Sequence, residues 1–82
     1  MASKRMKNRL YWLAVKAHGT EHEGAVTAVY QRALEGWTDG RLSMAALIHE
    51  HQFGDHVPRR DLADERLWAG RAAIDAIRES AN

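Results

Sequence analysis

The chain of 82 residues contains no cysteine and a single proline, Pro58. The absence of cysteine excludes disulfide bonds, cysteine-ligated zinc and thiol catalysis, and it fits the reducing cytoplasm, where we expect the protein to act. One proline among abundant Ala, Leu, Arg and Glu favours helices over sheet. With 45% hydrophobic and 28% charged residues, the composition is that of a folded chain whose length suits one domain, residues 1–82. The sequence therefore predicts a single all-α domain.

Long apolar runs and catalytic signatures are also missing. The apolar run at residues 10–15 is too short for the core of a signal peptide or for a membrane span, so we expect no membrane partner. The sequence holds no nucleophile elbow, no zinc-protease motif and no phosphate-binding glycine loop. We therefore predict a protein that is not an enzyme, has no catalytic residues and needs no cofactor.

The charge is divided unevenly along the chain, although the net charge is only +1. Residues 1–20 carry five basic side chains and no acidic one, whereas the other 62 residues carry 7 basic and 11 acidic side chains. The first segment is therefore +5 and the remainder −4.

Four segments have the apolar periodicity of amphipathic helices, at about 3–18, 21–36, 43–53 and 58–79. Ser3 is placed to cap the first, and Thr20 with Glu23 predicts a capping box at the second. Asp39-Gly40 predicts a turn, after which Ser43 caps a shorter third helix. Short connections favour antiparallel neighbours, so we expect a compact bundle of three long helices and one short helix.

Each predicted helix has one stripe that we assign to the core. Gly70 lies on the last stripe and indicates close approach of two helices. The four stripes are Met6, Leu10, Leu13 and Ala17; Val26, Val29, Tyr30, Ala33 and Trp37; Met44, Leu47, Ile48 and His51; and Ala63, Leu67, Gly70, Ile74 and Ile77.

Two tryptophans, Trp12 and Trp68, fall off these stripes and among charged side chains. Beside Trp12, Tyr11 and Val15 form a second apolar patch behind the core stripe of the first helix. Aromatic and arginine side chains often dominate interfaces, so we predict that this surface binds a protein partner or a second copy of the chain. The predicted partner-binding residues are Arg5, Arg9, Tyr11, Trp12, Lys16, Trp68 and Arg71.

The predicted function is that of a small regulator or inhibitor, which acts by occupying a surface of a larger macromolecule. Small size, missing catalytic motifs and divided charge resemble, in type, the short accessory proteins carried by phages and other mobile elements. An inhibitor of a host or defence complex is one such protein.

Nucleic-acid binding is the alternative. Arg5, Arg9, Trp12 and Lys16 recur at i, i+4, i+7 and i+11, a basic stripe with an aromatic ring that can stack on a base. The pair Arg59 and Arg60 can also open a recognition helix. The acidic remainder of the chain opposes this alternative, because it repels phosphate.

Histidines raise the question of a metal site, since His49, His51 and His56 lie close in sequence. On a helix, however, His49 and His51 diverge by about 200°. The pair His18 and His22 has suitable spacing, but the residues between them break the helix. We therefore predict no metal site.

Overall fold

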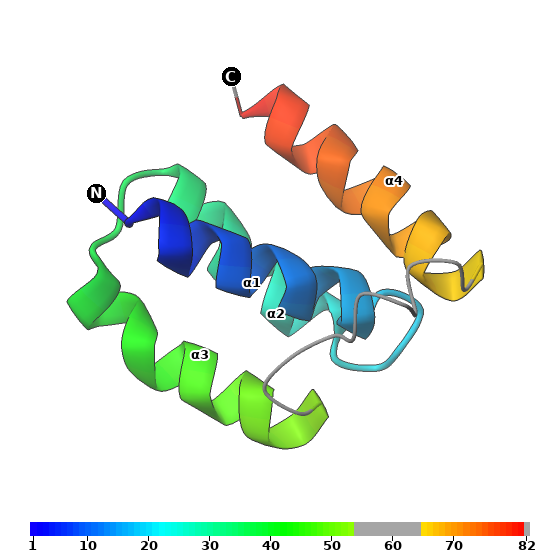
Figure 1. The fold of residues 1–82 in the computed structure, drawn as a ribbon, viewed down its shortest axis with the longest axis horizontal. Coiled ribbons are helices and arrows are strands. Elements are labelled where there is room, and N and C mark those ends of the chain that lie inside the picture. The colour runs from blue at the N-terminus through cyan, green and yellow to red at the C-terminus, as the bar shows by residue number, and fades with distance from the viewer. Residues whose placement is uncertain (54–64, 82) are drawn as a thin grey trace.

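The computed structural model describes residues 1–53 and 65–81, and these form four helices with no strand among them (Figure 1). The helices are α1 (Lys4–Ala17), α2 (Glu23–Leu34), α3 (Asp39–Phe53) and α4 (Glu65–Ser80). The predicted all-α bundle is therefore confirmed. The predicted start of the last helix at Pro58, together with His56, Arg59, Arg60 and Ala63, lies outside the described residues.

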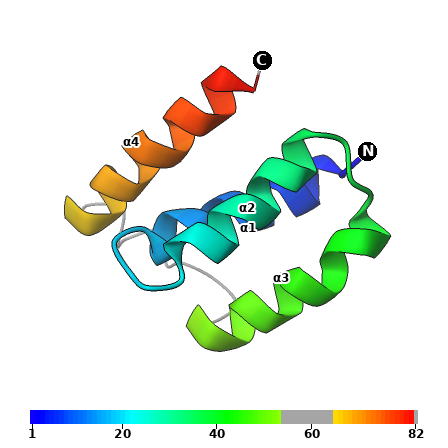
Figure 2. The same ribbon diagram turned by 180° about the vertical axis from the view of Figure 1, so that it is seen from behind.

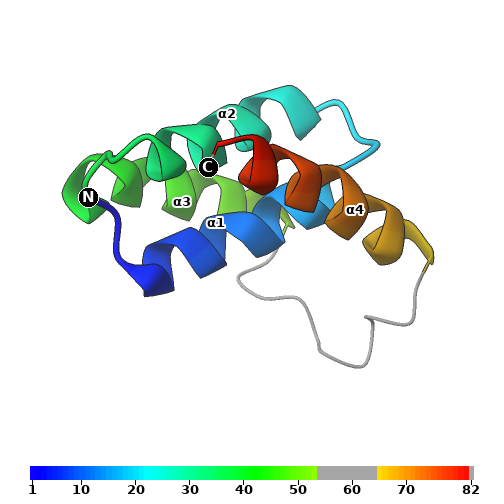
Figure 3. The ribbon, with the colours of Figure 1, turned by 90° about the horizontal axis from the view of Figure 1, so that it is seen from above.

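The hairpin of α1 and α2 forms the centre of the bundle, and α3 and α4 lie on its two flanks (Figure 1 and, from behind, Figure 2). Helix α1 contacts all three other helices, whereas the described parts of α3 and α4 do not contact each other. Seen from above, α4 lies in front of the α1–α2 hairpin and α3 lies behind it (Figure 3). The bundle therefore has two separate outer flanks.

Helix α1 begins at the predicted cap, because the hydroxyl of Ser3 accepts a hydrogen bond from the Met6 amide at 3.1 Å. Its predicted core stripe is buried throughout, and so are the predicted stripe residues of α2 except the half-buried Trp37. Burial on α1 also extends to Tyr11, Ala14 and Val15, since helices cover this segment from three sides. Helix α1 is thus the central helix of the core.

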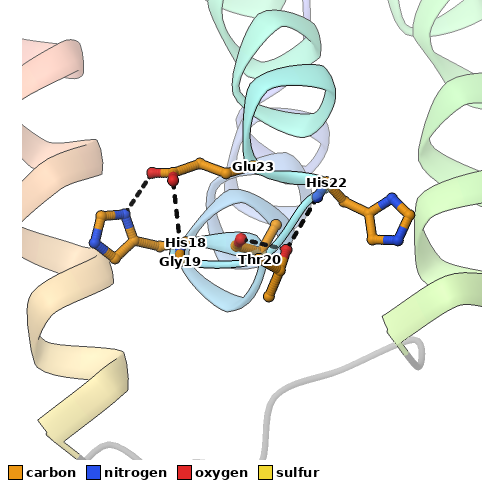
Figure 4. Close-up of polar contacts among 6 residues, drawn as sticks. His18, Gly19, Thr20, His22 and Glu23 are labelled. Atoms are coloured by element: carbon orange, nitrogen blue, oxygen red, sulfur yellow. Dashed lines mark hydrogen bonds and ion pairs between the residues drawn. The ribbon is translucent and has the colours of Figure 1, made fainter.

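Glu23 fastens the turn between α1 and α2 (Figure 4). Its carboxylate accepts a hydrogen bond from the Gly19 amide at 3.3 Å and lies 2.6 Å from Nδ1 of His18. Both contacts lower the pKa of Glu23 below its ordinary value, and the hydrogen bond from Gly19 contributes most. Gly19 has a φ of +82°, the left-handed conformation that ends α1 here as predicted.

The predicted capping box is wrong, because Thr20 lies within the turn and α2 begins three residues later at Glu23. The Thr20 hydroxyl donates to the carbonyl of Ala17 at 2.6 Å and accepts from the His22 amide at 3.2 Å (Figure 4). The Thr20 amide donates to the same carbonyl, so it is not available to a carboxylate at Glu23. The side chains of His18 and His22 lie on opposite sides of this turn.

Helix α3 begins earlier than predicted. Gly36, with a φ of +106°, ends α2 in a Schellman motif in which the Trp37 amide donates to the Arg32 carbonyl at 3.1 Å. Thr38 is then the cap of α3, since its hydroxyl accepts a 3.4 Å hydrogen bond from the Arg41 amide.

The predicted turn at Asp39-Gly40 is therefore the first turn of α3, and Ser43 is not a cap. The Ser43 hydroxyl instead donates to the Asp39 carbonyl at 2.6 Å within the helix. With 15 residues, α3 is longer than α2, which has 12, so the prediction of a short third helix is corrected.

Candidate interaction surfaces

The outer side of α3 carries three large apolar side chains that are exposed to solvent. Met44 is 67% exposed, Leu47 55% and Ile48 50%, and His51 on the same side is exposed as well. The prediction that these residues form the core stripe of the third helix is therefore wrong. We call Met44, Leu47 and Ile48 the α3 apolar face.

Helix α3 packs inward through one leucine and two alanines instead. Leu42 and Ala46 are 1% and 0% exposed, and the half-buried Ala45 packs against the same core. Alanines at a helix contact leave room for a close approach, so this narrow stripe is sufficient to seat α3 on the hairpin. The α3 apolar face consequently points outward.

An ion pair fixes this orientation of α3. Arg9 on α1 engages Glu50 on α3 through two hydrogen bonds, with Nε 2.7 Å from Oε2 and a second contact between Nη2 and Oε1. The Glu50 side chain is 12% exposed, so the pair is partly shielded from solvent, and hydrogen bonding to Glu50 raises the pKa of Arg9. Arg9 is thus committed to an internal contact.

A hollow of about 610 Å³ lies beside the α3 apolar face, between α1 and α3. Leu47 lines it together with Arg5, and Arg5 is exposed and has no ion pair with a described residue. The remaining lining residues are Ser3, Met6, Arg9, Asp39 and Glu50. The apolar face therefore continues into a concave surface whose lining includes a cation without an ion pair to a described residue.

On the opposite flank, α4 covers the apolar patch that we predicted to remain open on the first helix. Tyr11 is 7% exposed and Val15 1%, so neither is available to a partner, and this part of the predicted interface is corrected. Helix α4 comes this close because Gly70 has no side chain: a Cβ there would lie 2.5 Å from the Val15 carbonyl oxygen. The close approach predicted at Gly70 is therefore confirmed.

Arg71 lies between two tryptophans on this flank. Its guanidinium carbon is 5.7 Å from the ring centroid of Trp12 and 5.1 Å from that of Trp68. Trp12 is half-buried and meets Tyr11 edge-on at 5.1 Å, whereas Trp68 is 55% exposed. Of the two tryptophans predicted to face outward, Trp68 does so and Trp12 packs against the core.

A groove of about 340 Å³ runs beside this cluster, at the contact of α1, α2 and α4. Its charged lining residues are four cations and one acid. The lining is Lys4, Lys7, Asn8, Tyr11, Trp12, Tyr30, Leu34, Arg71, Asp75 and Arg78. We call it the α1/α4 groove.

The single acid of the groove, Asp75, is already engaged. It accepts a hydrogen bond from the Tyr11 hydroxyl at 2.9 Å and pairs with Arg78 at 3.3 Å. Burial raises the pKa of Tyr11, Arg71 opposes the shift and Asp75 adds to it. Three cations of the groove are left without an ion pair to a described residue, namely Lys4, Lys7 and Arg71.

The basic stripe predicted on the first helix is not a row of equivalent cations. Arg9 is held by Glu50, and Trp12 lies beside Arg71 of α4. Lys16 is half-buried and has an interaction of its own, which leaves Arg5 as the fully exposed member. The groove cations Lys4, Lys7 and Arg78 were not predicted, although Lys4 and Lys7 lie one turn apart and within reach of Tyr11 along α1.

No three side chains of the types His, Cys, Asp and Glu are grouped to hold a metal ion within residues 1–53 and 65–81. His49 lies 3.2 Å from the Gln52 side-chain oxygen, and His51 is exposed. The four helices, as far as they are described, include none that is long and apolar enough to cross a membrane.

Neither a known protein family, nor a curated protein, nor a solved structure matches this chain. Its function must therefore be inferred from the two surfaces described above.

Proposed function

We propose that the protein is a small, non-enzymatic binding protein that regulates or inhibits a larger protein partner in the cytoplasm, as an accessory protein of a phage or mobile element would. The observation that carries this proposal is the α3 apolar face. Three large apolar side chains within two helical turns are each at least half exposed, and such a patch on a small soluble protein is typical of an interaction site.

The proposed occupant is an amphipathic helix of the partner. Met44, Leu47, Ile48 and His51 follow the spacing i, i+3, i+4 and i+7, which presents one continuous seam along α3. A helix lying on this seam buries its own apolar stripe against the three side chains. Arg5, which lines the neighbouring hollow, favours an acidic residue on that helix.

Three side chains supply only part of an ordinary interface, which buries about 800 Å² on each partner. The hollow between α1 and α3 extends the surface next to Leu47 and adds polar groups around the apolar centre. An apolar centre with a polar rim is the usual composition of a protein interface. This flank therefore supports a protein partner better than a nucleic acid.

Site-specific photo-crosslinking in the native host tests the proposal. A photoreactive amino acid at Leu47 is expected to trap one partner protein, whereas the same amino acid at Ala72, an exposed position of α4, is expected to trap none. If the position at Leu47 crosslinks only to other copies of this protein, the α3 apolar face joins a homo-oligomer and does not bind a different partner. Equal products from both positions, or none, would contradict a specific surface on α3.

A further inference from the structure

We infer that the α1/α4 groove binds a nucleotide, either as a free molecule or as a unit of a single-stranded nucleic acid. This site lies on the flank opposite the α3 apolar face, and it is independent of the protein-binding function proposed above. The inference rests on the charge, the aromatic lining and the size of the groove.

Charge is the first argument. Four cations line the groove, and its one acid, Asp75, is engaged by Tyr11 and Arg78. Because like charges gathered around a hollow repel one another, an anion that enters between them relieves this repulsion. Lys4 and Lys7 extend from one wall and Arg71 and Arg78 from the other, so a phosphate between the walls meets cations on both sides.

Aromatic and guanidinium surfaces next to these cations favour a nucleotide over inorganic phosphate. Trp12 lines the groove and is only half-buried, and Arg71 lies beside its ring. Bases stack on tryptophan rings and on arginine planes. Asn8, which is exposed on the same wall, offers an amide that can donate to and accept from a base edge.

Arg71 itself has unused hydrogen-bonding capacity. Its Nε–H is buried and has no acceptor among the described residues, and the side chain forms no ion pair with them. The Nε–H itself is inaccessible, but the guanidinium lines the groove and no ion pair to a described residue occupies it, so its other N–H groups can bind an incoming anion. The volume of about 340 Å³ is at the lower end of the range for small-ligand sites, about 300 to 1,000 Å³, and fits one nucleotide.

Tryptophan fluorescence measures this binding directly in the full-length protein. Substitution of Trp37 and Trp68 by Phe leaves Trp12 as the reporter. The probes are ADP, a single-stranded oligothymidylate, inorganic pyrophosphate and poly-glutamate. We expect ADP or the oligonucleotide to quench Trp12, and we expect the affinity to fall several-fold as salt rises. Tighter binding of the oligonucleotide than of ADP identifies a strand as the source, and the reverse identifies a free nucleotide.

Charge reversal supplies the control. The double variant Lys4→Glu/Lys7→Glu is expected to weaken binding at least about tenfold, because it replaces two of the cations that face the phosphate. Arg41→Glu makes a charge reversal at an exposed position outside the groove and is expected to leave the affinity unchanged. Circular dichroism of each variant verifies that the helices are retained.

Three results would overturn the inference. The first is the absence of quenching by ADP and by the oligonucleotide. The second is equal binding of poly-glutamate, which would assign the groove to an acidic protein segment. The third is an equal loss of affinity in Arg41→Glu. None of these results bears on crosslinking at Leu47, so the two proposals fail separately.

Discussion

Leu13 and Leu47 are leucines in the middle of helices, yet their side chains are 4% and 55% exposed. The difference decides what each contributes. Leu13 lies in the core of the central helix, where removal of its methyl groups leaves a cavity, whereas Leu47 is already largely in water. Both positions look alike in sequence, because each belongs to an apolar set with helical spacing.

The pair gives a matched test of the burial described here. Leu13→Ala is expected to lower the free energy of unfolding by about 2 to 5 kcal/mol. Leu47→Ala, the same chemical change at an exposed site, is expected to change it by less than about 0.5 kcal/mol. Chemical denaturation of both variants measures the difference. Comparable losses at the two positions would mean that Leu47 is a core residue.

At the scale of the element, the existence and the core stripes of α1, α2 and α4 could be predicted, whereas the cap at the start of α2 could not. Ser3, Gly19 and the stripes of α1, α2 and α4 carry local signals that the structure confirms wherever it describes them. Helix α3 could not be predicted in the same way, because both of its sides are apolar. Because the predicted helix began at Ser43, Leu42 lay outside it. The residues of the α3 apolar face were then the best candidates for the core stripe.

The orientation of α3 depends on contacts that are distant in the sequence. Arg9 and Glu50 are 41 residues apart, and nothing in the pattern around either one indicates the other. The covering of Tyr11 by α4 is similar, since it requires the close approach at Gly70. Local periodicity predicts helices and their apolar faces, but packing between elements decides which of two apolar faces is buried.

Gly70 tests the packing of α4 on α1. Substitution of glycine by alanine in a helix normally gains up to about 1 kcal/mol. Gly70→Ala is nevertheless expected to destabilise the protein by about 1 to 3 kcal/mol, because its Cβ would lie 2.5 Å from the Val15 carbonyl oxygen. The control is Gly24→Ala on α2, where no atom lies within 4 Å of the added methyl group and a small gain is expected. Thermal melting compares them, and a stabilised Gly70→Ala protein would disprove the close contact.

At the scale of the whole molecule, the bundle separates two kinds of surface. The α3 flank presents apolar side chains beside a hollow lined by Arg5, and the α4 flank presents the basic α1/α4 groove with Trp68 nearby. The α1–α2 hairpin lies between them, and α3 and α4 make no contact through their described residues. A charge-reversal variant on one flank is therefore expected to leave the structure of the other flank unchanged.

The sequence indicated the residue types of these surfaces better than their positions. Trp68 is exposed as predicted and lies beside the half-buried Arg71, and Arg5 is exposed. Arg9 and Tyr11 are used internally, and the α3 apolar face was assigned to the core. A small bundle exposes part of its apolar surface, but which helix retains that exposure depends on the three-dimensional packing.

The central claim is that the α3 apolar face is the binding surface. It is tested most directly by measuring the affinity of the crosslinked partner for the Leu47→Asp variant and for the unmodified protein. A carboxylate in the middle of the α3 apolar face must be desolvated when the partner helix binds, so we expect the dissociation constant to rise at least about 30-fold, equivalent to about 2 kcal/mol, with an unchanged melting temperature. Ala72→Asp introduces the same side chain at an exposed site on α4 and is expected to leave the affinity unchanged. Unchanged affinity of Leu47→Asp would contradict the assignment of the α3 apolar face as the binding surface.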